Sequence, residues 1–232
     1  MTTIKKTTFN KKSILFFLCF IFIGFKADAN DYSDFLFYKN KGDTANALRV
    51  LYSLSETMNP EDEYYYNVLD NIITFETDVV KMKETTEKKI PLVSDRSRRS
   101  LLMGRSALIM LLTGMIDKAE YYYETAYTIN PSENNLEYLI NAAALNLETG
   151  NIEKSLQLSK FVKNNSSNAE KMEKAELIVS YVNILKNDTK ATETKLNNML
   201  DGKIKNEGVL FSIYKLSVWY KIKSIEIKSS KI

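Results

Sequence analysis

One pattern of turn residues occurs twice in the chain and constrains its fold more than any other feature. Lys41 to Pro60 reads KGDTANALRVLYSLSETMNP, and Thr113 to Pro131 reads TGMIDKAEYYYETAYTINP. Each stretch has a glycine, an alanine five residues later, an apolar run and an Asn-Pro pair about one helix length further on. A third, partial copy begins at Gly150. Because glycine readily ends a helix and proline interrupts one, the pattern predicts a series of helical hairpins.

The first 29 residues are typical of a secretory signal peptide. Lysines near the start precede an apolar run from Ser13 to Phe25, and Ala27-Asp28-Ala29 offers a cleavage site. The run is shorter than the roughly 20 residues that cross a bilayer, so we expect cleavage rather than a membrane anchor. We therefore expect an exported protein, periplasmic or secreted, with no stable membrane insertion. Lipid modification at Cys19 is the alternative, although large residues precede that cysteine.

Removal of residues 1–29 changes the charge of the chain. The full sequence has 32 Lys and Arg against 29 Asp and Glu, and five lysines and one aspartate lie in the signal, which leaves 27 against 28. Asp31–Val80 then carries a net charge of −7 and Asp201–Ile232 a net charge of +4. These ends either meet a charged partner or further copies of the chain, or are solvated surfaces. The basic residues form no stripe interleaved with aromatic residues, so no nucleic-acid partner is expected.

Helical periodicity divides the remaining chain into paired segments. No strand-like alternation competes, which indicates an all-α fold stabilised by packing, because the mature chain has no cysteine for a disulfide. Pro91–Ser100 reads as a linker entering a helix. We expect helical repeats over residues 30–200 and a capping helix with a basic tail over 201–232. The expected helices span residues 31–41, 44–57, 61–89 with a break near Thr77-Asp78, 100–112, 116–129, 136–149, 152–162, 170–186, 190–200 and 207–223.

The unit that begins at Ser100 resembles the tetratricopeptide repeat (TPR), a 34-residue helix-turn-helix with small residues at three fixed positions and a late proline. These positions are filled by Ala107, Ala119, Ala126 and Pro131. The unit from Leu136 lacks the proline and has Val162 at the last small position, but it keeps Ala143, Gly150 and Ser155. The early tryptophan and Leu-Gly pair of the family are absent. The resemblance implies antiparallel helix-turn-helix repeats stacked as a right-handed superhelix.

The resemblance also implies where a partner binds. Members of this family bind a peptide or helix in a concave groove lined by the first helix of each hairpin. The carboxylate clamp of some members is not matched, because Gly104 and Leu108 stand at two of its positions, so a mainly apolar groove is expected. The alternative is that Leu108 and Leu112 belong to the core. The positions that correspond to the groove are Leu101, Leu108, Leu112, Glu137, Ala144, Glu148, Lys174 and Tyr181.

Two runs of three tyrosines, Tyr64–Tyr66 and Tyr121–Tyr123, also draw attention because tyrosine is favoured at protein interfaces. Three consecutive helical residues spread over about 300° of the helix circumference, so they cannot share one face. We therefore expect one or two tyrosines of each run to be buried and the remainder to be partly exposed.

The sequence contains little that could catalyse a reaction. Histidine is absent from the whole chain and cysteine from its mature part, which removes the commonest general base, metal ligand and thiol nucleophile. Carboxylate pairs such as Glu120 and Glu124 have the spacing of a solvated helix face. We expect no enzymatic activity, no metal and no cofactor.

The function expected from these features is a protein-interaction scaffold of the cell envelope or the secreted space, binding a partner peptide or helix. The alternative is a structural subunit of an envelope or secretion assembly that associates with itself through its acidic and basic ends.

Overall fold

The computed structural model describes residues 32–186, 189–201, 208–209 and 211–214. Every regular element in these ranges is helical, which confirms the all-α prediction. The predicted signal segment, the Asn187-Asp188 turn and most of the helix predicted over 207–223 lie outside the described residues. The chain divides into two compact units, the first ending at Phe75 and the second beginning at Glu76.

The first unit is a helical hairpin followed by a third helix. Asp43 starts the second helix of the hairpin, because its Oδ1 accepts a hydrogen bond from the N–H of Asn46 at 3.1 Å. Phe35 is fully buried, and its ring meets Phe75 edge-on with centroids 6.1 Å apart. The helices are α2 (Tyr32–Asn40), α3 (Thr44–Thr57) and α4 (Glu63–Phe75).

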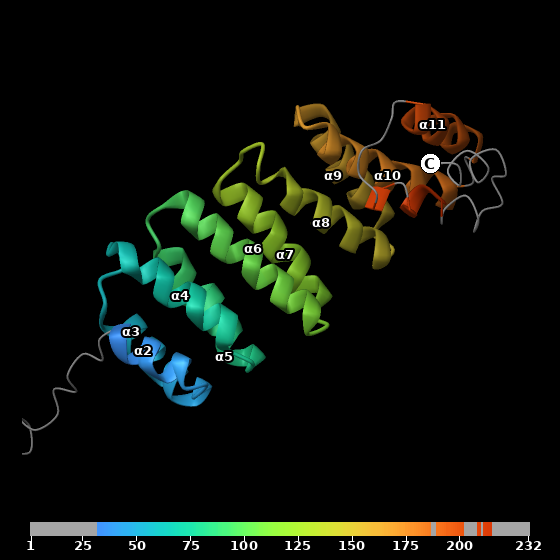
Figure 1. Ribbon diagram of the computed structural model, residues 1–232. Helices are drawn as coiled ribbons and strands as arrows, with labels where there is room; N and C mark the ends of the chain where they lie inside the picture. Colours follow the sequence, from blue (N-terminus) through green and yellow to red (C-terminus); the bar gives the residue numbers. More distant parts are fainter. Residues whose placement is uncertain (1–31, 187–188, 202–207, 210, 215–232) are drawn as a thin grey trace, which may run out of the picture. The chain divides into compact units, whose positions relative to one another are not determined.

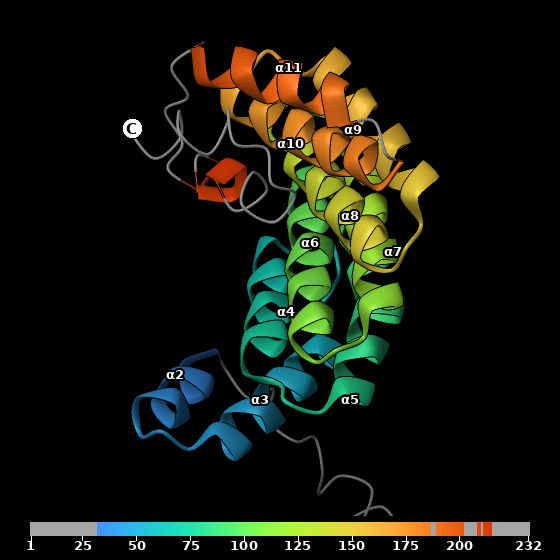
Figure 2. The same ribbon diagram turned by 90° about the vertical axis from the view of Figure 1, so that its right-hand side faces the viewer.

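The second unit continues the pairing of helices. Consecutive helices from α6 to α11 pack side by side in chain order, and α8 also packs against α10 (Figures 1 and 2). A π-helical turn (Thr85–Lys89) and a 3-10 turn (Ile90–Leu92) lie between α5 and α6. The break predicted near Thr77-Asp78 is confirmed. The helices are α5 (Val79–Glu84), α6 (Arg96–Leu112), α7 (Ile116–Ile129), α8 (Leu136–Glu148), α9 (Ile152–Asn165), α10 (Ala169–Leu185) and α11 (Thr189–Asp201).

Three glycines end the first helices of their hairpins in the same way. Gly42, Gly114 and Gly150 have φ angles of 72°, 80° and 82°, a left-handed conformation that strains any residue with a Cβ. In each turn, the N–H after the glycine donates to the carbonyl five residues earlier, which satisfies an otherwise unpaired end of the helix. These bonds are Asp43 to Tyr38 at 2.9 Å, Met115 to Met110 at 2.8 Å and Asn151 to Asn146 at 2.7 Å. The predicted hairpin turns are therefore confirmed.

The linker predicted over Pro91–Ser100 is wrong for most of its length. Pro91 lies in the 3-10 turn, and α6 already begins at Arg96. The helix starts early because Oδ1 of Asp95 accepts a hydrogen bond from the N–H of Arg98 at 2.9 Å, an N-terminal cap. Within the predicted linker, residues 93–95 are the ones without helical structure.

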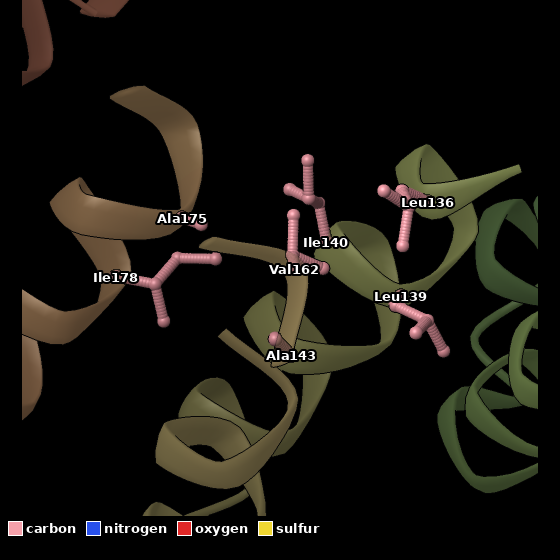
Figure 3. Packing of buried hydrophobic residues seen from close by; sticks show 7 residues of the cluster. All are labelled: Leu136, Leu139, Ile140, Ala143, Val162, Ala175 and Ile178. Atoms are coloured by element: carbon pink, nitrogen blue, oxygen red, sulfur yellow. The ribbon is translucent and has the colours of Figure 1, made fainter. Parts of the chain in front are cut away.

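The small residues predicted to lie between packed helices are buried. Ala107 of α6 and Ala119 and Ala126 of α7 are fully buried, as predicted from their spacing. The next hairpin accommodates Val162 at a small-residue position, also without exposure. Figure 3 shows this part of the core, which joins α8, α9 and α10 through Leu136, Leu139, Ile140, Ala143, Val162, Ala175 and Ile178.

Candidate functional site

The residues predicted to line a partner groove lie on α6, α8 and α10, the first helices of three successive hairpins. Lys174 Nζ of α10 donates to Glu137 Oε1 of α8 at 2.8 Å and also lies 3.0 Å from Glu170 Oε1. Burial lowers the pKa of Lys174, but its bonds to Glu137 and Glu170 outweigh that effect and raise it. Equivalent positions on neighbouring first helices therefore meet, and their charges are paired.

Leu101, Leu108 and Leu112 form an exposed leucine stripe along α6. Their exposed fractions are 39%, 48% and 76%, respectively. They share one face of the helix, and at 1.5 Å per residue the stripe is about 16 Å long. The alternative that Leu108 and Leu112 belong to the core is therefore wrong.

The other predicted groove residues differ from one another in exposure. Ala144 is half-buried against the core between α8, α9 and α10, and Tyr181 is half-buried against a second core cluster that includes Ile184. Glu148 is exposed at the end of α8. Leu185, exposed at the end of α10, was missed, although the spacing between equivalent positions of the first helices would have found it.

Gly104 has a structural role in α6 and offers no open binding position. A Cβ at this position would lie 2.5 Å from Cζ of Tyr138 in α8, so glycine leaves room for the tyrosine ring. Tyr138 in turn stacks on Tyr123, with ring centroids 6.1 Å apart. The position at which a carboxylate clamp would need a polar side chain is therefore filled by packing.

The sequence did not predict a cavity of about 500 Å³ formed by the π-helical turn, α6 and α7. At 100° per residue, the residues of α6 that line it, Arg99 and Met103, point about 160–200° away from the leucine stripe. The cavity and the stripe therefore lie on opposite sides of α6. We call it the tyrosine cavity. Its lining includes Glu87, Arg99, Met103, Lys118, Tyr121 and Tyr122.

Glu87 in this lining has its charge balanced within the protein. Its Oε1 accepts hydrogen bonds from Lys118 Nζ at 2.9 Å and from the hydroxyl of Tyr122 at 3.0 Å. The bond from Lys118 is the main reason that the pKa of Glu87 is lowered. Burial, followed by the bond to Glu87, raises the pKa of the Tyr122 hydroxyl. Glu87 is therefore a carboxylate at neutral pH, and Tyr122 remains protonated.

Arg99 has no such balance. Its Nη1 donates to the carbonyl of Pro91 over 3.3 Å, and its Nε is buried without a hydrogen-bond partner. Among the described residues, no carboxylate forms an ion pair with Arg99. With Glu87 and Lys118 offsetting each other, the lining carries one net positive charge.

A second hollow, of about 360 Å³, lies among α9, α10 and α11, and we refer to it as the lysine hollow. At its centre Glu176, only 8% exposed, forms ion pairs with Lys163 at 2.5 Å and Lys195 at 3.1 Å. Burial raises the pKa of Glu176, but the two lysines more than offset this and lower it. With Glu173 also in the lining, the charges of this hollow cancel.

The two runs of tyrosines follow the prediction from helix geometry. Tyr65, Tyr122 and Tyr123 are buried, whereas Tyr64 and Tyr121 are exposed. The first two tyrosines of the second run both line the tyrosine cavity.

Glu120 and Glu124 of α7 differ from the solvated pair that their spacing predicted. Both carboxylates lie 2.6 Å from Nζ of Lys154 in α9. Their bonds to this lysine overcome the lowering effect of burial and raise its pKa. The pair therefore ties one hairpin to the next.

Within the described ranges, no helix has the length and apolar character needed to cross a membrane. The same ranges hold no group of three or more His, Cys, Asp or Glu side chains that could bind a metal ion. Searches with protein-family models and among curated proteins found no match for the chain.

Proposed function

We propose that this chain is an exported, non-enzymatic interaction scaffold whose leucine stripe binds an amphipathic helix of another protein. The observation that carries the proposal is the exposure of Leu101, Leu108 and Leu112 on one face of α6. Moving a leucine from full exposure to full burial contributes about 1.5–3 kcal/mol, and a partner would supply the share of this that belongs to the surface still exposed on each leucine. Such a stripe is therefore suited to an interface.

A partner helix matches the stripe in length and spacing. The stripe runs along α6 for about 16 Å, which is three helical turns. Amphipathic helices recognised in this way present anchors at positions i, i+3 or i+4, and i+7, which cover about 10 Å, so one further anchor at i+11 lets a partner helix follow the whole stripe. Beside the stripe, the charges of Glu137 and Lys174 are already paired, so recognition should depend mainly on apolar contacts.

The second unit fits a stack of TPR-type hairpins, and we include this fold in the proposal. Gly114 and Gly150 end successive first helices with the same hydrogen bonds, and the small residues at the predicted positions are buried. In that architecture the first helices line the binding face. The N-terminal sequence supports export, because its charged start, apolar run and cleavage motif are those of a signal peptide.

Photocrosslinking in the cells that produce the protein tests this function. A photoreactive residue replaces Leu112 in one variant and Val80 of α5 in the control; these side chains are 76% and 75% exposed, respectively. We expect one protein to be crosslinked from position 112 and not from position 80, through an amphipathic helix of that partner.

Three results would contradict the proposal. One is the absence of any crosslinked protein at position 112, and another is equal crosslinking from both positions. The third is a crosslink to a second copy of this chain, which would instead favour a self-associating structural subunit.

A further inference from the structure

We propose that the tyrosine cavity binds a small organic monoanion, a carboxylate attached to an aromatic or aliphatic body. Its carboxylate is held by Arg99, and its body lies against Met103, Tyr121 and Tyr122. This inference goes beyond the proposed function, because the leucine stripe is on the opposite side of α6 and needs no small ligand.

The size and lining of the cavity are those of a ligand site. Small-molecule sites have volumes of roughly 300–1,000 Å³, with mostly apolar and aromatic walls and a few polar groups that fix orientation. At about 500 Å³, the tyrosine cavity falls within this range. Met103, Pro91 and Ile129 provide apolar surface, and Tyr121 and Tyr122 provide aromatic surface.

The charge of the ligand follows from the hydrogen bonds in the lining. Glu87 is already bonded to Lys118 and Tyr122, so it neither needs a cation nor repels an anion strongly. Arg99 retains an uncompensated charge and a buried Nε without a partner. Because Arg99 lines the cavity without a carboxylate partner, a ligand carboxylate would supply the missing negative charge and accept N–H bonds from the terminal nitrogens of the guanidinium.

The position of Arg99 is partly fixed before any ligand arrives. Its Nη1 donates to the carbonyl of Pro91 in the 3-10 turn, and its backbone belongs to the first turn of α6. A guanidinium that is already held by one hydrogen bond loses less conformational freedom on binding, which favours affinity. A neutral amide of the same shape could accept an N–H bond but would leave the positive charge of Arg99 unbalanced, so the structure favours the anion.

Isothermal titration calorimetry of the purified protein tests this site with phenylacetate, indole-3-acetate and decanoate. The neutral amide of each acid is measured in parallel, because it keeps the body and removes the charge. We expect at least one of the three acids to bind in a one-to-one complex. Its amide should bind at least about tenfold more weakly, which corresponds to about 1.4 kcal/mol.

Variants locate the binding. Arg99→Met removes the charge and retains much of the side-chain volume, whereas Arg98→Met removes a charge next to it that does not line the cavity. We expect at least about a tenfold loss of affinity in the first variant and unchanged affinity in the second. Tyr121→Ala removes an exposed wall of the cavity, so it should retain the fold and weaken binding of the aromatic acids.

The proposal is overturned if none of the three acids binds or if the amides bind as tightly as the acids. Unchanged affinity in Arg99→Met would also overturn it. Should Arg99→Met fail to fold, the amides and Tyr121→Ala still decide the question: equal affinity for acid and amide, or full affinity in Tyr121→Ala, rejects the site.

Discussion

The tyrosine cavity and the lysine hollow have equivalent places in the second unit but differ in charge. The charges that line the lysine hollow balance, whereas the lining of the tyrosine cavity carries one net positive charge. In the register that pairs the first helices, Met103 of α6 corresponds to Glu176 of α10, and Arg99 corresponds to Met172. Methionine and a charged residue have therefore exchanged positions. In the lysine hollow the buried charge is matched by two lysines, whereas in the tyrosine cavity one arginine has no carboxylate partner among the described residues.

The two sites lie at corresponding positions of different hairpins. This difference in charge makes the lysine hollow a structural site and the tyrosine cavity a candidate ligand site. Paired charges across three helices tie those helices together and leave no net charge for a ligand to neutralise. An unmet charge beside aromatic walls stabilises the fold less and is available to a ligand. Changes in the lysine hollow should therefore affect stability, and changes in the tyrosine cavity should affect binding.

The largest effect on stability is expected from Glu176→Met, which gives the lysine hollow the residue found in the tyrosine cavity. The change leaves Lys163 and Lys195 without their shared carboxylate. Breaking a fully buried pair costs about 3–5 kcal/mol, but these lysines are 43% and 37% exposed and can turn to water, so we expect a loss of about 2 kcal/mol. Urea unfolding at neutral pH measures it.

Glu173→Met is the matched control, because Glu173 lines the same hollow without forming an ion pair in the described part of the chain. Burial and the nearby Glu170 raise the pKa of Glu173, so its charge is slightly unfavourable there. The control should retain or slightly increase stability. Equal losses of stability in both variants would show that the ion pairs of Glu176 with the two lysines do not stabilise the fold.

A smaller effect is expected in acid. Because the folded-state pKa of Glu176 is lowered, its stabilising contribution is present above its ordinary value of about 4.5 and is lost as the pH falls through the folded-state value. The pKa of Glu87 is also lowered, so its contribution to stability is lost in acid as well. Its side chain is 39% exposed, so this contribution should be smaller.

Unfolding measured from about pH 6 to about pH 3 compares the two carboxylates in this range. Glu176→Gln should remove more of the acid-induced loss of stability than Glu87→Gln. The reverse order would contradict the proposed division between a structural and a ligand site.

Most of the fold could be predicted because helical periodicity and turn glycines are local signals. The bounds of α3 and α7 agree with the sequence prediction, and three glycines mark hairpin turns. The start of α6 was missed, because the cap at Asp95 lies within a polar run that reads as a loop. A capping bond depends on backbone geometry at one residue, so composition alone did not reveal it.

The candidate sites differ in how far the sequence could predict them. The leucine stripe follows from the repeat register, since one face of a first helix is defined by spacing alone. The tyrosine cavity depends on an irregular π-helical turn that brings Glu87 to Lys118, 31 residues later. One sequence signal could have indicated the contact between Glu87 and Lys118, namely a glutamate and a lysine about one repeat apart. Two further pairs with this spacing, Glu120 with Lys154 and Glu153 with Lys186, also form hydrogen bonds.

The central claim, that the face formed by the first helices binds a partner protein, is tested most directly from the neighbouring helix. A photoreactive residue at Glu148 of α8 reports on the partner while the stripe on α6 is changed at its two most exposed positions by Leu108→Ser and Leu112→Ser. We predict that the crosslink obtained in the unchanged protein falls at least about tenfold in the double variant, with little change in its unfolding midpoint. An undiminished crosslink, or general unfolding of the double variant, would contradict the claim.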